Sequence, residues 1–196
     1  MHMQIQCECG NFRAELTNFP KSTPGRLVCY CDDCQSYLHY LKRADLLDVH
    51  GGTEIIPNYP ADVKIVAGKE LVKCTRVKPD GMFRFSTTCC NTPIANTQPG
   101  RPWAGFHRRM FSKKVEESLG PVKSSIMGKY AKGTPPPGTP KTFNLKAMKL
   151  VLPYILKGIF LGKAKHSPFF ANGEALVLPE VLSADERQAA RAAAGV

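Results

Sequence analysis

Apolar and polar residues alternate at the start of the chain and predict a β-hairpin. The alternation covers residues 3–9, stops at the turn-forming pair Gly10 and Asn11, and resumes over residues 12–16. Successive side chains on a strand point to opposite faces, so each strand would bury one face and expose the other. We therefore expect the chain to open with two short antiparallel strands.

A second hairpin is predicted in the middle of the chain. Residues 71–77 and 82–88 are rich in β-branched and aromatic side chains, and Pro79-Asp80-Gly81 between them has the composition of a tight turn. If these three residues form the turn, Cys74 lies directly opposite Ser86, with their Cβ atoms about 4.5–5.5 Å apart.

Shorter segments complete the expected elements of the N-terminal half. Strands are expected at residues 26–28, 55–59 and 63–66, and short helical pieces at 35–41 and 43–47. The predicted fold class is therefore mainly β, built from antiparallel sheets.

The pattern changes beyond residue 97. A linker-like break at 98–102 is followed by a proline-rich stretch at 134–140, and apolar residues then recur at helical spacing over 145–161. We expect two parts, a β domain over residues 1–97 and a basic, partly helical extension over 98–196 that packs on it.

The helix expected at 145–161 is the most apolar stretch of the chain. Pro153 and Lys157 interrupt it, and about 20 uninterrupted apolar residues are needed to span a bilayer, so no transmembrane segment is expected. Two placements remain open, one packed on its own domain and one at a membrane interface, because lysines flank the stretch at Lys146, Lys149, Lys157, Lys163 and Lys165.

A last helix is expected to start at Ser183. Ser183 is suited to the N-cap position, and Glu186 three residues later completes a capping box. We expect the alanine-rich end of this helix to fray.

Charge is distributed unevenly along the 196 residues, which carry a net charge of +11. Residues 1–100 hold 11 Lys/Arg and 10 Asp/Glu, whereas residues 101–196 hold 16 and 6. A basic half can attract nucleic acid, an anionic surface or an acidic partner, or it can simply be solvated. Aromatic residues interleave the basic ones in a way that suits base stacking, at Arg101, Trp103, Phe106, Arg108, Arg109 and Phe111.

Seven of the eight cysteines fall into three short clusters, and only Cys74 stands apart. The clusters are Cys7-Glu8-Cys9, Cys29-Tyr30-Cys31-Asp32-Asp33-Cys34 and Cys89-Cys90. The N-terminus has no basic region followed by an apolar run, so we expect no secretory signal, a cytoplasmic location and reduced thiols. Closely spaced reduced cysteines indicate metal binding more than disulfides.

The central cluster is the candidate working site. Cys29, Cys31 and Cys34 place three thiols within six residues, and three protein ligands on a tetrahedral zinc ion leave one position for water or substrate. Cys7 and Cys9 are two residues apart on an expected strand, so both sulfurs can face one ion.

These motifs resemble the glutathione-dependent formaldehyde-activating enzyme family, which also includes centromere protein V. The resemblance covers residues 3–95. It implies an Mss4-like, mostly antiparallel β fold with two zinc ions, one structural ion on Cys7, Cys9 and a later Cys-x-x-Cys, and one catalytic ion on Cys29, Cys31 and Cys34. The string over residues 167–174 is similar to that of uncharacterised bacterial relatives, which suggests a divergent bacterial-type member with a C-terminal extension.

The third motif departs from the family pattern Arg-x-Phe-Cys-x-x-Cys-Gly-Thr-Pro. Alignment on Thr92-Pro93 puts Thr87 at the first cysteine, and alignment on Phe85 puts Ser86 there, so one expected ligand is missing either way. Three alternatives stay open. Cys89 and Cys90 both bind the ion, Cys74 substitutes for the lost ligand, or the structural zinc is absent.

The resemblance implies a zinc protein, with one or two ions, that acts as a carbon–sulfur lyase on glutathione–formaldehyde adducts. Arg84, Lys42 and Arg43 are candidates to meet the carboxylates of glutathione, while Tyr37 is expected in the core or the pocket wall. The alternative is a non-catalytic zinc module whose basic C-terminal half binds nucleic acid, an anionic surface or a protein. Whether the chain is an enzyme stays open between these two hypotheses.

Overall fold

The structure, a computed structural model, describes residues 2–196 and is mainly β, as predicted. The strands are β1 (Met3–Gln6), β2 (Arg13–Leu16), β3 (Leu27–Cys29), β4 (Thr53–Asn58), β5 (Val63–Ala67), β6 (Val72–Arg76), β7 (Phe83–Thr87), β8 (Pro93–Thr97), β9 (Ala104–His107), β10 (Ser124–Ile126), β11 (Phe170–Ala171), β12 (Glu174–Ala175) and β13 (Pro179–Val181). The α-helices are α1 (Asp32–Tyr40), α2 (Val115–Leu119), α3 (Leu145–Phe160) and α4 (Ala184–Ala194).

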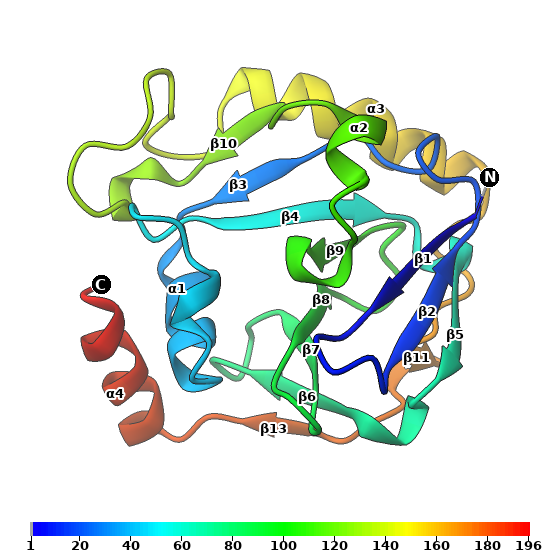
Figure 1. The fold of residues 1–196 in the computed structure, drawn as a ribbon, viewed down its shortest axis with the longest axis horizontal. Coiled ribbons are helices and arrows are strands. Elements are labelled where there is room, and N and C mark those ends of the chain that lie inside the picture. Colours follow the sequence, from blue (N-terminus) through cyan, green and yellow to red (C-terminus); the bar gives the residue numbers. More distant parts are fainter. Residues whose placement is uncertain (1) are drawn as a thin grey trace.

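An eight-stranded sheet forms the body of the molecule, in the order β10-β3-β4-β9-β8-β7-β6-β13. A three-stranded sheet, β1-β2-β5, lies beside it on the right of Figure 1, and β11 pairs with β12 in a small hairpin. Helices α1 and α4 lie next to each other at the other side, while α3 runs along an outer edge.

The predicted boundary at residue 97 falls inside the large sheet and is corrected by the structure. Strand β9 pairs with β4 on one side and β8 on the other, so the C-terminal half supplies an inner strand. Strands β10 and β13 extend both edges by parallel pairing with β3 and β6, so the sheet is mixed and not purely antiparallel. Sequence periodicity could not reveal this, because the pairing partners are far apart in the chain.

The two predicted hairpins form, but the register of the second differs by one residue. Strand β6 pairs with β7 so that Cys74 lies opposite Phe85, and Lys73 opposite Ser86. The turn is tighter than expected, because Gly81 N–H donates to the Lys78 carbonyl at 2.8 Å and closes a four-residue β-turn in place of a three-residue loop. A shift of one residue changes every facing pair, and the geometric reason for Cys74 as a ligand is thereby removed.

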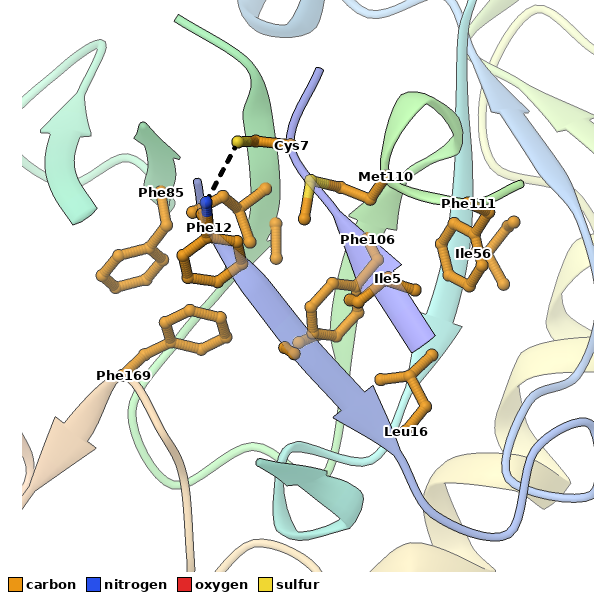
Figure 2. Close-up of a cluster of buried hydrophobic side chains, with 14 of the residues drawn as sticks. Ile5, Cys7, Phe12, Leu16, Ile56, Phe85, Phe106, Met110, Phe111 and Phe169 are labelled. Atoms are coloured by element: carbon orange, nitrogen blue, oxygen red, sulfur yellow. Dashed lines mark hydrogen bonds between the residues drawn. The ribbon is translucent and has the colours of Figure 1, made fainter. Parts of the chain in front are cut away.

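The core lies between the two sheets and is rich in phenylalanine (Figure 2). The rings of Phe85 and Phe169 stack with centroids 4.4 Å apart, and Phe106 is fully buried beside them. Phe169 comes from the C-terminal half, so both halves build one core. Cys7 lies at the margin of this core, and its sulfur accepts a hydrogen bond from the Phe12 N–H at 3.2 Å.

The basic and aromatic pattern around residue 106 does not form a stacking surface. Phe106 and Phe111 are 0% and 5% exposed, so their rings are unavailable to bases. Arg108 is engaged with Glu116, and Arg109 with Glu8. The part of this pattern from Phe106 to Phe111 is therefore a packed strand and turn, which gives the alternative of base stacking no support there.

Both predicted C-terminal helices are present. In α3 the Asn144 side chain caps the first turn by accepting from Ala147 N–H at 3.0 Å, and none of the helices within residues 2–196 is long and apolar enough to cross a membrane. Ser183 and Glu186 form the capping box of α4.

The expected fraying of α4 is wrong. Ala190 and Ala194 are buried where α4 packs on α1, and Arg191 binds Asp32 at 2.7 Å. Helix α4 lies beside α1 (Figure 1), and its buried alanines, Ala190 and Ala194, have small side chains that let the two helices approach closely.

Candidate metal centres

Four cysteines from two distant motifs converge at one end of the small sheet. The sulfurs of Cys7, Cys9, Cys89 and Cys90 all lie within 4.8 Å of one another. Individual sulfur–sulfur distances are 3.5 Å for Cys7–Cys9, 3.3 Å for Cys9–Cys89 and 3.7 Å for Cys89–Cys90. With zinc–sulfur bonds of about 2.3 Å, the edges of a tetrahedral site are about 3.8 Å, so this donor set fits one zinc ion.

A tight turn, and not strand alternation, brings Cys7 and Cys9 together. Strand β1 ends at Gln6, and the chain then turns with Gly10 N–H bonded to the Cys7 carbonyl at 3.0 Å. Gly10 has φ of 79°, a conformation that glycine adopts at little cost. The sequence correctly predicted that the two sulfurs lie close together, but the strand expected to carry both ends at Gln6, before either cysteine.

The second pair follows β7 in another turn. Thr87 N–H donates to the Thr92 carbonyl at 3.0 Å, and the hydroxyls of Thr87 and Thr92 lie 3.4 Å and 3.0 Å from the Cys90 sulfur. Burial raises the pKa of Cys90, but hydrogen bonds from these two hydroxyls and from Cys9 together outweigh it and lower the pKa to about 5. Thr87 therefore supports the Cys90 thiolate, and Cys89 supplies a fourth sulfur to the group.

Charged side chains tie the two turns together. Arg43 binds Glu8 at 2.8 Å and donates to the Cys90 carbonyl at 3.3 Å, and Arg109 also binds Glu8. Hydrogen bonding to Arg109, together with the charge of Arg43, lowers the pKa of Glu8. Arg43, considered above for a substrate carboxylate, has acidic partners within the protein in Glu8 and Asp45.

Cys74 lies outside both cysteine groups found among residues 2–196. It is 2% exposed and packs in the core, and burial raises its pKa to about 12. A neutral thiol in an apolar setting behaves as a small hydrophobic side chain. The proposal that Cys74 replaces the lost ligand is corrected accordingly.

The second group is formed by Cys29, Cys31 and Cys34, whose sulfurs also lie within 4.8 Å of one another. Cys29 ends β3, Cys31 is the N-cap of α1, and Cys34 is in the first turn of that helix. The chain bends back between strand and helix, with Cys34 N–H donating to the Cys31 carbonyl at 3.1 Å. Within residues 2–196 no fourth donor side chain joins these three, and three soft donors fit a zinc ion that keeps one position free.

Arg84 places a buried positive charge against this group. Its guanidinium is 5% exposed, lies 3.6 Å from the Cys34 sulfur and stacks over the Tyr37 ring at 5.3 Å. Hydrogen bonding from Cys29 and Cys31, followed by the Arg84 charge, holds the pKa of Cys34 well below its usual range. Arg84 was considered for a substrate carboxylate, and the structure gives it a cysteine partner.

A small cavity with several polar groups in its lining borders the same cysteine. Its volume is about 20 Å³, and its lining includes Cys34, Tyr37, Arg84, Asn96 and His107. His107 Nδ1 accepts from the Arg109 N–H at 3.0 Å, so in the neutral ring Nε2 carries the proton. His107 Nε2 and Asn96 Oδ1 have no hydrogen-bond partner within residues 2–196. The cavity has room for about one water-sized group.

Comparison with known protein families assigns the chain to one family. A family of unknown function, DUF6151, matches residues 2–180. The chain belongs to this family. No curated protein matches the chain. A crystal structure of a Rhodobacter sphaeroides protein is similar over 61% of this chain and 97% of that chain, with 17% sequence identity and a TM-score of 0.41.

Two residues at the second centre of this DUF6151 member were missed by sequence reasoning. His107 and Asn96 come from β9 and the adjacent β8, and β9 lies in the half that was expected to be a separate extension. No local motif marks them. A Cβ on Gly105 would lie 2.5 Å from Asn96 Oδ1, so the glycine in β9 makes room for this amide, and that is the one signal the sequence carries.

Proposed function

We propose that the protein binds two zinc ions, a structural ion on Cys7, Cys9, Cys89 and Cys90 and a working ion on Cys29, Cys31 and Cys34. The main support for this assignment is that one group contains four cysteine sulfurs and the other contains three. Four sulfurs complete a tetrahedral site, whereas three leave a position for a ligand. A divergent member of the formaldehyde-activating superfamily with an Mss4-like fold would have this pair of sites.

We further propose a small thiol, with glutathione as the first candidate, as the ligand of the second site. A zinc ion held there would favour the thiolate form of a bound thiol by its positive charge. Addition of that thiol to formaldehyde forms one carbon–sulfur bond, moves the carbonyl π electrons to oxygen, and transfers the thiol proton to that oxygen overall. The product is S-hydroxymethylglutathione, and the reverse reaction is a carbon–sulfur lyase step.

The residues of the chain support this chemistry in distinct ways. Arg84 balances the negative charge of Cys34, which keeps the cysteine in its binding form. His107 lines the cavity beside Cys34, and its Nε2–H, which has no partner within residues 2–196, is available to donate a hydrogen bond to a water-sized group there. All eight cysteines are free, as a reducing compartment such as the cytoplasm would keep them.

Metal content and thiol binding of two matched variants test the proposal. Wild type should hold about two zinc ions per chain, and both Cys31→Ser and Cys9→Ser about one. Glutathione should bind to wild type and Cys9→Ser but not to Cys31→Ser, measured by calorimetry. Formation of S-hydroxymethylglutathione, followed by exchange NMR, should be faster with wild type than with Cys31→Ser.

Two results would overturn it. Equal glutathione binding by wild type and Cys31→Ser would remove the second site from the function. Zinc at both sites with no glutathione binding would favour the non-catalytic zinc module.

A further inference from the structure

Helix α3 turns an apolar face away from the protein. Its buried residues are Ala147, Tyr154 and Gly158, which form a narrow stripe along one side. The opposite side holds Leu145, Met148, Leu152, Leu156 and Ile159, which are 72%, 44%, 48%, 48% and 58% exposed. Phe160 at the C-terminal end of α3 and the C-cap residue Leu161 add further exposed apolar side chains, at 92% and 57%.

The inner side of α3 is fixed closely to the protein, so the outer face cannot turn inward. The Tyr59 and Tyr154 rings stack at 4.4 Å, and the Tyr59 hydroxyl donates to the Tyr154 carbonyl at 2.9 Å. A Cβ on Gly158 would lie 2.6 Å from the Tyr59 ring and 2.8 Å from Pro102. These contacts hold the exposed apolar face at the outer edge of the molecule (Figure 1).

The charge around α3 has one sign. Residues 118–173 contain nine lysines and no aspartate or glutamate. Lys163 binds Asp62 at 2.5 Å, and the other eight lysines form no ion pair within the described part of the chain. Lys146, Lys149 and Lys157 lie on α3 itself and are exposed.

We propose that α3 docks on an anionic membrane surface, with its apolar face in the headgroup and acyl boundary and its lysines against the lipid phosphates. An apolar helix face edged by lysines is the composition that binds such an interface. Nucleic acid would use the lysines but leave the leucines in water. A second copy of the chain would bring two lysine-rich edges together, which opposes pairing. This inference is independent of the proposed zinc chemistry.

Vesicle sedimentation with the full-length, zinc-loaded protein tests the proposal. We expect binding to vesicles of phosphatidylcholine with about 30% phosphatidylserine, weak binding to phosphatidylcholine alone, and loss of binding as salt rises. Leu152→Glu/Leu156→Glu should weaken binding at least about ten-fold. Lys149→Gln and Lys157→Gln should weaken it about five-fold each.

Matched controls separate docking from folding. Val49 and Leu178 are 87% and 91% exposed and lie outside α3, so Val49→Glu/Leu178→Glu makes the same chemical change elsewhere and should bind as wild type. If the glutamate variant of α3 melts at a lower temperature than wild type, Leu152→Ser/Leu156→Ser replaces it.

Several outcomes would overturn the proposal. They are equal binding to neutral and anionic vesicles, unchanged binding after loss of Leu152 and Leu156, and a dimer by light scattering that fails to bind vesicles. Binding to DNA that needs the lysines but not the leucines, without vesicle binding, would overturn it as well.

Discussion

At the scale of single residues, the neighbours of a buried cysteine decide whether its thiol is held as a thiolate or packs as a neutral side chain. Cys34 and Cys74 are both buried, but Cys34 faces Arg84 and two other thiols, whereas Cys74 packs in the apolar core. The same residue type therefore has a lowered pKa in one place and a raised pKa in the other. Environment, and not spacing alone, separates the two roles.

Replacement of Arg84 tests the charge against Cys34. Arg84→Met should lower the free energy of unfolding by about 3–5 kcal/mol, because a buried negative sulfur loses its partner. Arg84→Lys should cost less, since it keeps the charge. Urea denaturation of the zinc-loaded proteins measures both, and equal losses for the two variants would show that the charge is not what matters.

The raised pKa of Cys74 gives a pH dependence. Its pKa is about 12 in the folded protein, against an ordinary value of 9.0, so the folded state favours the neutral thiol. That stability is fully present below pH 9 and is lost as the pH rises toward 12. Between pH 8 and pH 10, wild type should lose about 1 kcal/mol more unfolding free energy than Cys74→Ala.

Zinc content supplies the control for this prediction. Cys74→Ala should keep the same zinc content as wild type, because Cys74 belongs to neither cysteine group. A loss of one zinc ion in this variant would restore Cys74 as a ligand.

At the scale of elements, close contacts explain why α3 keeps a glycine in its interior. Gly158 faces the Tyr59 ring and Pro102, neither of which can move aside easily. Glycine lowers the helix propensity at this position. In return, its lack of a side chain lets the helix backbone pack closely against Tyr59 and Pro102.

Gly158→Ala should destabilise the protein despite its better helix propensity. The propensity gain is about 1 kcal/mol, whereas overpacking costs about 1–3 kcal/mol. We expect a net loss of up to about 2 kcal/mol in thermal or urea unfolding. Lys157→Ala, at the adjacent exposed position, should change stability by less than about 0.5 kcal/mol. A stabilised Gly158→Ala protein would mean that α3 is not held against Tyr59.

At the scale of the whole molecule, the two halves of the chain form one folding unit. Strand β9 fills the place between β4 and β8, and Phe169 completes the core around Phe85 and Phe106. Without the C-terminal half, the inner strands β3, β4, β6 and β8 would each lose a neighbour and become open edges, and several large side chains would be exposed.

A fragment of residues 1–97 should therefore fail to fold, although the cysteine motifs alone suggested a domain with these limits. Residues 1–182 keep β13 and lack only α4, so this fragment should fold with reduced stability. Circular dichroism melts distinguish the two, and a cooperative transition for residues 1–97 would contradict a single unit.

Much of the local structure was determined by the sequence. The β1–β2 and β6–β7 hairpins, α3 and the capping box at Ser183 followed from period, turn residues and capping chemistry, which act between neighbours in the chain. The spacing of Cys29, Cys31 and Cys34 likewise confined three sulfurs to one place, because a single strand-to-helix bend carries all of them.

Only the tertiary structure decided what depends on distant pairing. It placed Cys89 and Cys90 beside Cys7 and Cys9, paired Cys74 with Phe85 and buried it in the core, and put His107 of β9 in the lining of the same cavity as Cys34. It also turned the apolar face of α3 outward. Local periodicity reports which residues share a face, but the partner that covers that face is fixed by the packing of the whole chain.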